Sequence, residues 1–125
     1  MSNSKKILIV DDSEAIRISL KGILESSSIS CTILESENGS DAIQSYKDNK
    51  PDVVIMDVYM PKTNGIKALQ SILEFDKKAK IVMITAAAKS KLVRQSIGIG
   101  AKDYILKPFD RIIVSNVVGN VLNKS

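Results

Sequence analysis

The stretch "VVIMDVYMP", residues 53–61, places a charge where the apolar pattern predicts the protein interior. Its first four residues are apolar and mostly β-branched, as in a strand that is buried on both faces of a parallel sheet. Asp57 follows directly, at the point where such a strand ends. A buried carboxylate costs solvation free energy unless it is paired. The fold of the rest of the chain therefore has to bring a compensating group to Asp57.

Four more short apolar runs predict strands: "ILIV" at 7–10, "CTIL" at 31–34, "IVMI" at 81–84 and "YIL" at 104–106. Between and after these runs, apolar residues recur at intervals of three and four, which predicts amphipathic helices. The five sets are Ile16, Leu20, Ile23 and Leu24; Ala42, Ile43 and Tyr46; Ile66, Leu69, Ile72 and Leu73; Leu92, Val93 and Ile97; and Ile113, Val114, Val117, Val118, Val121 and Leu122.

Polar residues mark the ends of these elements. Ser13 and Asp110 precede predicted helices as capping residues, and Asn38 and Ser40 lie where the second helix begins. Alternating strands and helices predict an α/β fold, a doubly wound parallel sheet with five helices on its two faces. Residues 1–125 are expected to form one domain, and the strand order 2-1-3-4-5 is taken from the common five-stranded precedent.

Composition limits the function classes. No apolar run approaches the roughly 20 residues that cross a bilayer, and the N-terminus lacks the apolar core of a secretory signal, which predicts a cytoplasmic protein. The net charge of +4 is spread along the chain and aromatic residues make up 4%, so we expect no direct binding to nucleic acid. Cys31 is the single cysteine and is expected at a half-buried strand position, with a plain packing role. The absence of histidine excludes catalysis by a Ser-His or Cys-His pair and histidine metal sites.

Polar side chains follow four of the predicted strands. These are Asp11 and Asp12, Asp57, Thr85, and Lys107 before Pro108. In a parallel sheet the carboxyl ends of the strands form one edge, where ligands bind, and neighbouring strands lie about 5 Å apart. Carboxylates about 4 Å apart repel by on the order of 4 kcal/mol per pair at an effective dielectric constant of about 20. A positive group must therefore lie among them.

A bound metal ion and the ammonium group of Lys107 could each supply this positive charge. An oxygen-only site half built by protein suits Mg²⁺, and the flexible side chain of Lys107 can lean back toward Asp57. Such a pocket suits phosphoryl transfer, with Asp57 as the nucleophile that forms an acyl phosphate. Each residue taken alone has a plainer interpretation, because Asp11 and Asp12 could cap a helix and Lys107 could lie on the surface.

The segments "ILIVDDS", "VVIMDVYMP", "ITA" and "DYILKPF" resemble the receiver domains of two-component response regulators, especially the single-domain chemotaxis type. The resemblance implies that Asp57 is the phosphoacceptor. It also implies that Asp12, Asp57 and the backbone carbonyl of Tyr59 bind Mg²⁺ directly, and that Asp11 binds it through water.

The resemblance further implies a switch. Thr85 would hydrogen-bond the phosphoryl group, Lys107 would form an ion pair with it, and Tyr104 would turn inward when Thr85 moves. The Lys107–Pro108 peptide bond is cis in many members of the family. Tyr59 and Ala87 occupy positions that influence how long the phosphoryl group survives, and the bulky ring of Tyr59 is expected to shield it from water.

The predicted function is that of a signalling switch that promotes its own phosphorylation and dephosphorylation rather than an enzyme acting on a separate substrate. A histidine kinase or phosphotransfer protein would be the donor. The surface of the fourth helix, fifth strand and fifth helix would bind a downstream motor or adaptor protein. That surface carries Lys89, Lys91, Arg94, Lys102 and Arg111, which favours an acidic partner.

Three alternatives stay open. The chain could be a docking module with the same fold that never carries phosphate, or a receiver excised from a larger regulator, since it ends soon after its fifth helix. A flavodoxin-like nucleotide binder is less consistent with the sequence. It needs glycines and backbone amides after the first strand, where this chain has "DDSEA".

Overall fold

The computed structural model describes residues 4–60, 64–86 and 91–124. Its strands are β1 (Lys5–Val10), β2 (Cys31–Ser36), β3 (Val53–Asp57), β4 (Ile81–Thr85) and β5 (Asp103–Leu106). They pair in parallel in the order β2-β1-β3-β4-β5. The helices are α1 (Glu14–Glu25), α2 (Gly39–Asn49), α3 (Gly65–Phe75), α4 (Lys91–Ile99) and α5 (Arg111–Leu122). The predicted fold class and strand order are confirmed.

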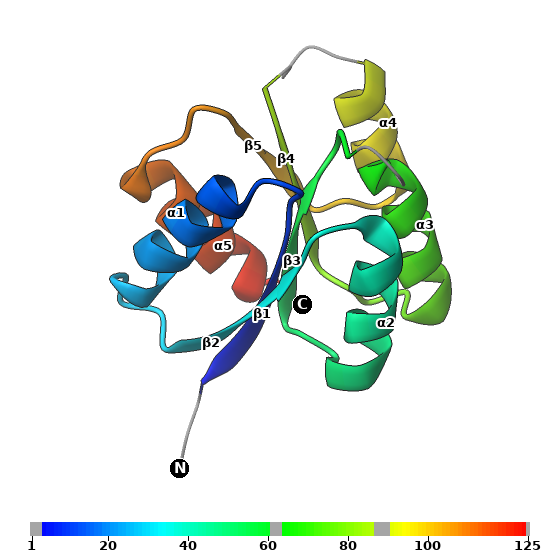
Figure 1. Ribbon diagram of the computed structural model, residues 1–125. Coiled ribbons are helices and arrows are strands. Elements are labelled where there is room, and N and C mark those ends of the chain that lie inside the picture. Colours follow the sequence, from blue (N-terminus) through cyan, green and yellow to red (C-terminus); the bar gives the residue numbers. More distant parts are fainter. Residues whose placement is uncertain (1–3, 61–63, 87–90, 125) are drawn as a thin grey trace.

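Helices cover both faces of the sheet (Figure 1): α1 and α5 lie on one face, and α2, α3 and α4 lie on the other. Alternate residues of β3 accordingly enter different cores. Val54 and Met56 pack in the core with α2 and α3, whereas Val53 and Ile55 pack in the core with α1 and α5. Every residue of β3 and β4 is buried, which explains why both strands read as unbroken apolar runs.

Capping side chains begin four of the helices. Ser13, Asn38 and Asp110 each accept a hydrogen bond from a backbone N–H three residues later, as the sequence predicted. Asn64 caps α3 in the same way and was not predicted. Ser40 lies inside the first turn of α2 rather than at its cap.

Two predicted apolar stripes are only partly buried. In α4, Val93 and Ser96 are buried, whereas Ile97 is 43% exposed. In α5, Val114, Val118 and Val121 are buried, whereas Ile113 is 47% exposed. The α5 sequence is apolar around most of its circumference, so its periodicity could not distinguish the face on the sheet from the face toward solvent.

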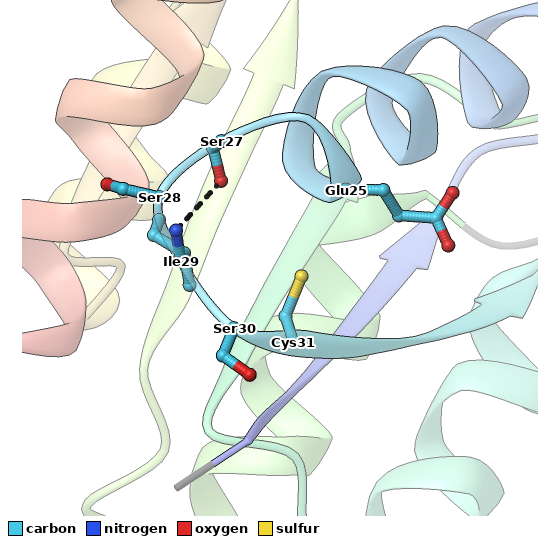
Figure 2. A pocket seen from close by; sticks show the side chains of 6 residues that line it. All are labelled: Glu25, Ser27, Ser28, Ile29, Ser30 and Cys31. Atoms are coloured by element: carbon cyan, nitrogen blue, oxygen red, sulfur yellow. Dashed lines mark hydrogen bonds between the residues drawn. The ribbon is translucent and has the colours of Figure 1, made fainter.

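Cys31 packs at the amino ends of the strands, at the edge opposite Asp57. It is half-buried, and burial raises the pKa of its thiol. It borders a shallow hollow lined by the α1–β2 connection, residues 27–30 (Figure 2). The higher pKa disfavours the reactive thiolate, which is consistent with a packing role. Within the described residues, no helix is long and apolar enough to cross a membrane.

Candidate functional site

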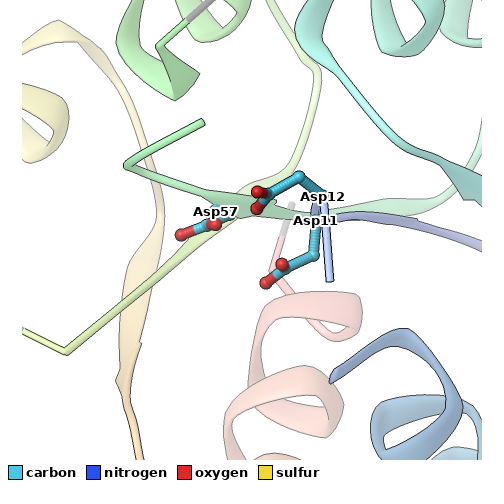
Figure 3. A group of neighbouring side chains, drawn as sticks. All are labelled: Asp11, Asp12 and Asp57. Atoms are coloured by element: carbon cyan, nitrogen blue, oxygen red, sulfur yellow. The ribbon is translucent and has the colours of Figure 1, made fainter. Parts of the chain in front are cut away.

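Three carboxylates converge at the carboxyl edge of the sheet. Asp11 and Asp12 follow β1, and Asp57 ends the neighbouring strand β3. Figure 3 shows the three side chains, from two adjacent strands, close to one another. One oxygen from each carboxylate lies within 4.8 Å of the others. The strand order changes direction between β1 and β3, because β2 is added next to β1 on one side and β3, β4 and β5 are added in turn on the other. The carboxyl ends of β1 and β3 are therefore the switch point of the sheet, where ligands bind in folds of this kind.

Lys107 provides the positive charge that the sequence required. Its Nζ lies 3.1 Å from Oδ2 of Asp11 and 3.6 Å from Oδ1 of Asp57. The side chain does reach Asp57, as predicted, but its shorter contact is with Asp11. Asp11 is fully buried, so it gains more than a solvated carboxylate would from a nearby ammonium group.

Asp11 and Asp12 differ sharply in their surroundings. Asp11 is held in place, since its Oδ1 accepts a hydrogen bond from the backbone N–H of Ser13 and its Oδ2 contacts Lys107. Asp12 is exposed, so its carboxylate is open to a cation that arrives from solvent. The pair thus offers one fixed and one accessible carboxylate.

Asp57 is the buried carboxylate of the site, with 4% of its surface exposed. Burial, and then the negative charge of Asp11, raise the pKa of Asp57 from 3.8 to about 6. The ammonium of Lys107 and the hydrogen bond from the Tyr59 backbone N–H lower this pKa, though by less. The ionised form of Asp57 is therefore unfavourable in the fold, although a pKa of about 6 leaves most of the carboxyl group ionised at neutral pH.

The loop after β3 returns close to Asp57. The backbone N–H of Gly65 donates to the carbonyl oxygen of Val58, at 2.9 Å. A Cβ atom at Gly65 would collide with the carbonyl oxygen of Asp57, so only glycine lets the start of α3 approach this closely. The beginning of α3 thereby supports the backbone that carries the carboxylate.

Thr85 and Tyr104 lie on the adjacent strands β4 and β5. Thr85 is buried at the end of β4, and its carbonyl accepts a hydrogen bond from the Lys107 backbone N–H. Thr85 pairs with Leu106, and Met83 pairs with Tyr104, so Thr85 and Tyr104 face the same side of the sheet. Tyr104 is 40% exposed, and Tyr59 is 50% exposed. The Lys107–Pro108 bond is cis, as the resemblance implied, and Ala87 and Lys89 lie outside the described residues.

Sequence patterns did not single out Arg17, which lies beside this site. Its guanidinium is buried and donates a hydrogen bond to the carbonyl oxygen of Asp11 at 2.6 Å. The sequence does contain an indication that Arg17 is buried. Arg17 lies three residues before Leu20 and seven before Leu24, which places it on the apolar face of α1. A charged residue on a buried helical face needs a specific partner.

The fold and the acidic carboxyl edge with its lysine define a class, that of receiver domains. A comparison with protein families agrees, since the response regulator receiver domain matches residues 7–118. The chain belongs to the response regulator receiver domain family. It is of the CheY type and is a phosphorylation-dependent signalling switch.

Individual relatives match nearly the whole chain. Chemotaxis protein CheY of Bacillus subtilis is 40% identical over 118 residues, covering 94% of this chain and 98% of that protein. Protein CcdB of the same organism is 42% identical over 117 residues, covering 94% and 97%. Among solved structures, a CheX-CheY-BeF3-Mg²⁺ complex from Borrelia burgdorferi contains a chain that is 38% identical. Its TM-score is 0.88, and the match covers 96% of this chain and 90% of that one.

The raised pKa of Asp57 predicts the effect of removing its charge. Because the pKa is higher in the folded protein, ionisation of Asp57 destabilises the fold as the pH rises from 3.8 through about 6. We expect Asp57→Asn to increase the free energy of unfolding at neutral pH by up to about 3 kcal/mol, from two pKa units. The gain should shrink as the pH falls toward 3.8. Denaturant unfolding in the presence of a chelator measures it.

The matched control is Glu74→Gln, which makes the same chemical change at an exposed position on α3. It should alter stability by less than about 0.5 kcal/mol. An Asp57→Asn protein that is no more stable than the wild type at neutral pH would contradict the electrostatic account of the site.

Proposed function

We propose that this receiver accepts a phosphoryl group on Asp57, in a Mg²⁺-dependent reaction, from a histidine kinase or a histidine phosphotransfer protein. The observation that carries the proposal is the convergence of three carboxylates within 4.8 Å, with Lys107 Nζ in contact with two of them. A carboxylate oxygen of Asp57 attacks phosphorus. The bond from phosphorus to the donor imidazole nitrogen breaks, and the electron pair of that bond stays on the nitrogen.

The donor set at this edge fits Mg²⁺. Carboxylates and a backbone carbonyl are hard oxygen ligands, and a site with one open side leaves room for waters and a phosphoryl oxygen. In the proposed site Asp12, Asp57 and the backbone carbonyl of Tyr59 hold the ion, and Asp11 holds it through water. Bound Mg²⁺ would neutralise negative charge on the transferred oxygens.

The residues of the chain then act on the acyl phosphate. Lys107 lies within reach of Asp57 and would form an ion pair with the phosphoryl oxygens. The hydroxyl of Thr85 would donate a hydrogen bond to the same group. As part of the proposal, the site promotes both the formation and the hydrolysis of the acyl phosphate, so the protein resets itself.

We extend the proposal to the output of the switch. Thr85 would move toward the phosphoryl group, and Tyr104, on the same side of the sheet, would turn inward. The half-exposed ring of Tyr104 is compatible with an outward starting position. The surface that changes is formed by α4, β5 and α5, which we call the output face.

The output face combines positive and apolar side chains. Its exposed cations are Lys91, Arg94, Lys102 and Arg111. Its large exposed apolar side chains include Ile97, Tyr104 and Leu106. Such a surface fits a downstream protein that presents acidic and apolar side chains together, for example a motor or adaptor component.

The phosphoacceptor role predicts a specific covalent product. Incubation with a small acyl phosphate and Mg²⁺ should add one phosphoryl group to the intact protein, measured by mass spectrometry. The addition should disappear in Asp57→Ala and in the presence of a chelator. A protein that gains no phosphoryl group would instead be a docking module with the receiver fold, and a gain that persists in Asp57→Ala would place the acceptor elsewhere.

The exposed ring of Tyr59 predicts an effect on the lifetime of the acyl phosphate. The ring lies two residues after Asp57 and would hinder water from reaching the phosphorus. Tyr59→Ala should therefore lose the phosphoryl group severalfold faster than the wild type, whereas Tyr59→Phe, which keeps the ring, should not. The rate is measured by mass spectrometry after the phosphodonor is removed. An unchanged rate in Tyr59→Ala would refute the shielding role.

The charge of the output face predicts a third outcome. Reversal at Lys91 and Arg94, each to Glu, should weaken binding of the phosphorylated protein to its downstream partner by roughly tenfold or more, because like charges would meet. Reversal at Lys47 and Lys67, on α2 and α3, is the control with the same change in net charge. Affinity is measured by biolayer interferometry with the purified partner that binds the phosphorylated form. Equal affinities of the two double variants for the partner would show that the output face is not the binding surface.

A further inference from the structure

Arg17 is a buried cation that lies outside the predicted set of site residues. Its side chain is 9% exposed. Taking a guanidinium out of water is costly unless its N–H groups are paired. Here Nε lies 3.0 Å from Oε1 of Glu35, and Nη1 donates to the Asp11 carbonyl oxygen at 2.6 Å. Nη2 lies 3.9 Å from the exposed Glu37. Arg17 thus joins α1, the end of β2 and the loop after β1.

The hydrogen bond from Arg17 to the Asp11 carbonyl affects the orientation of Asp12 as well as that of Asp11. The carbonyl that accepts from Arg17 belongs to the peptide group that links Asp11 to Asp12. The Asp11 side chain has its own restraints from Ser13 and Lys107. Among the described residues, no hydrogen bond or ion pair holds the Asp12 carboxylate. The direction in which Asp12 leaves the backbone therefore depends on the orientation of the peptide group that Arg17 holds.

We propose that Arg17 is a positioning residue for the metal site: by fixing the Asp11–Asp12 peptide group, it directs the Asp12 carboxylate toward Asp57. The inference rests on the proposed function, since it requires Asp12 and Asp57 to bind Mg²⁺ together. The planar guanidinium can contact the Asp11 carbonyl and the Glu35 carboxylate at once, which the single ammonium of a lysine does less well.

Electrostatics and positioning predict opposite changes in the affinity for Mg²⁺ when Arg17 is removed. A positive charge near a cation site repels the cation, so removing it should strengthen Mg²⁺ binding. Removal also frees the negative charge of Glu35, which acts in the same direction. A weaker affinity for Mg²⁺ after the loss of Arg17 can then come only from lost geometry.

The experiment compares Mg²⁺ binding in the wild type, Arg17→Met and Lys21→Met. The control removes a cation from the same helix at a position with no contact to the site. Titration of the isotope-labelled proteins with MgCl2, followed by NMR chemical shifts, gives the dissociation constants without any phosphorylation step. We expect Arg17→Met to bind Mg²⁺ about tenfold more weakly, as for other residues that orient metal ligands. Lys21→Met should bind as the wild type does, or slightly more tightly.

Each outcome has a distinct meaning. Equal or tighter binding by Arg17→Met would overturn the positioning role. A wild type that binds no Mg²⁺ would instead remove the proposed function, whatever Arg17 does. If Arg17 only tethers α1 to β2, its loss lowers the melting temperature and leaves the affinity of the folded protein for Mg²⁺ unchanged. Should Arg17→Met fail to fold, Arg17→Lys replaces it. A severalfold weaker affinity is then expected, and wild-type affinity in Arg17→Lys would overturn the inference.

Discussion

Repulsion among three carboxylates at one edge of the sheet is the constraint on which the site depends. Asp11, Asp12 and Asp57 approach one another far more closely than free carboxylates would. Burial, and then the negative charge of Asp11, raise the pKa of Asp57 to about 6, although the ammonium of Lys107 offsets part of the effect. The folded protein therefore keeps a carboxylate in a place where its charge is unfavourable. In the proposed function, that excess of negative charge is what would attract a divalent cation to the edge.

The carboxylates stay close together because the free energy gained by packing the surrounding structure exceeds the cost of their repulsion. β3 and β4 are buried along their whole length between two apolar cores, so the end of β3 cannot relax away from β1. Local contacts complete the support. Gly65 lets the start of α3 reach the Asp57 backbone, and the Ser13 N–H fixes the Asp11 carboxylate. The apolar cores, which play no chemical part, determine how close the charges stand.

The sequence predicted the structure best at positions where a single physical reason explains the type of residue present. A charged residue at the end of an apolar strand, as at Asp57, predicted both the strand and the edge. Capping by Ser13, Asn38 and Asp110 followed from their side-chain chemistry. The pattern failed for Ile97 and Ile113, because apolar spacing alone does not show which apolar side chains of a helix face the sheet. It also could not show that Lys107 lies nearer Asp11, since that depends on the relative burial of two carboxylates in three dimensions.

The size of the electrostatic effect limits how the proposed switch can work. Reversing a two-state equilibrium from 1:99 to 99:1 requires about 5.5 kcal/mol of differential stabilisation. Forming the acyl phosphate removes the unfavourable charge of the Asp57 carboxylate, which is worth at most about 3 kcal/mol from a shift of two pKa units, but it brings the negative charge of the phosphoryl group to the same edge. Only the part of that free energy that differs between the two states moves the equilibrium. Charge compensation at Asp57 is thus too small by itself, and contacts that exist in one state alone, from Thr85 and Lys107 to the phosphoryl group, have to provide the remainder.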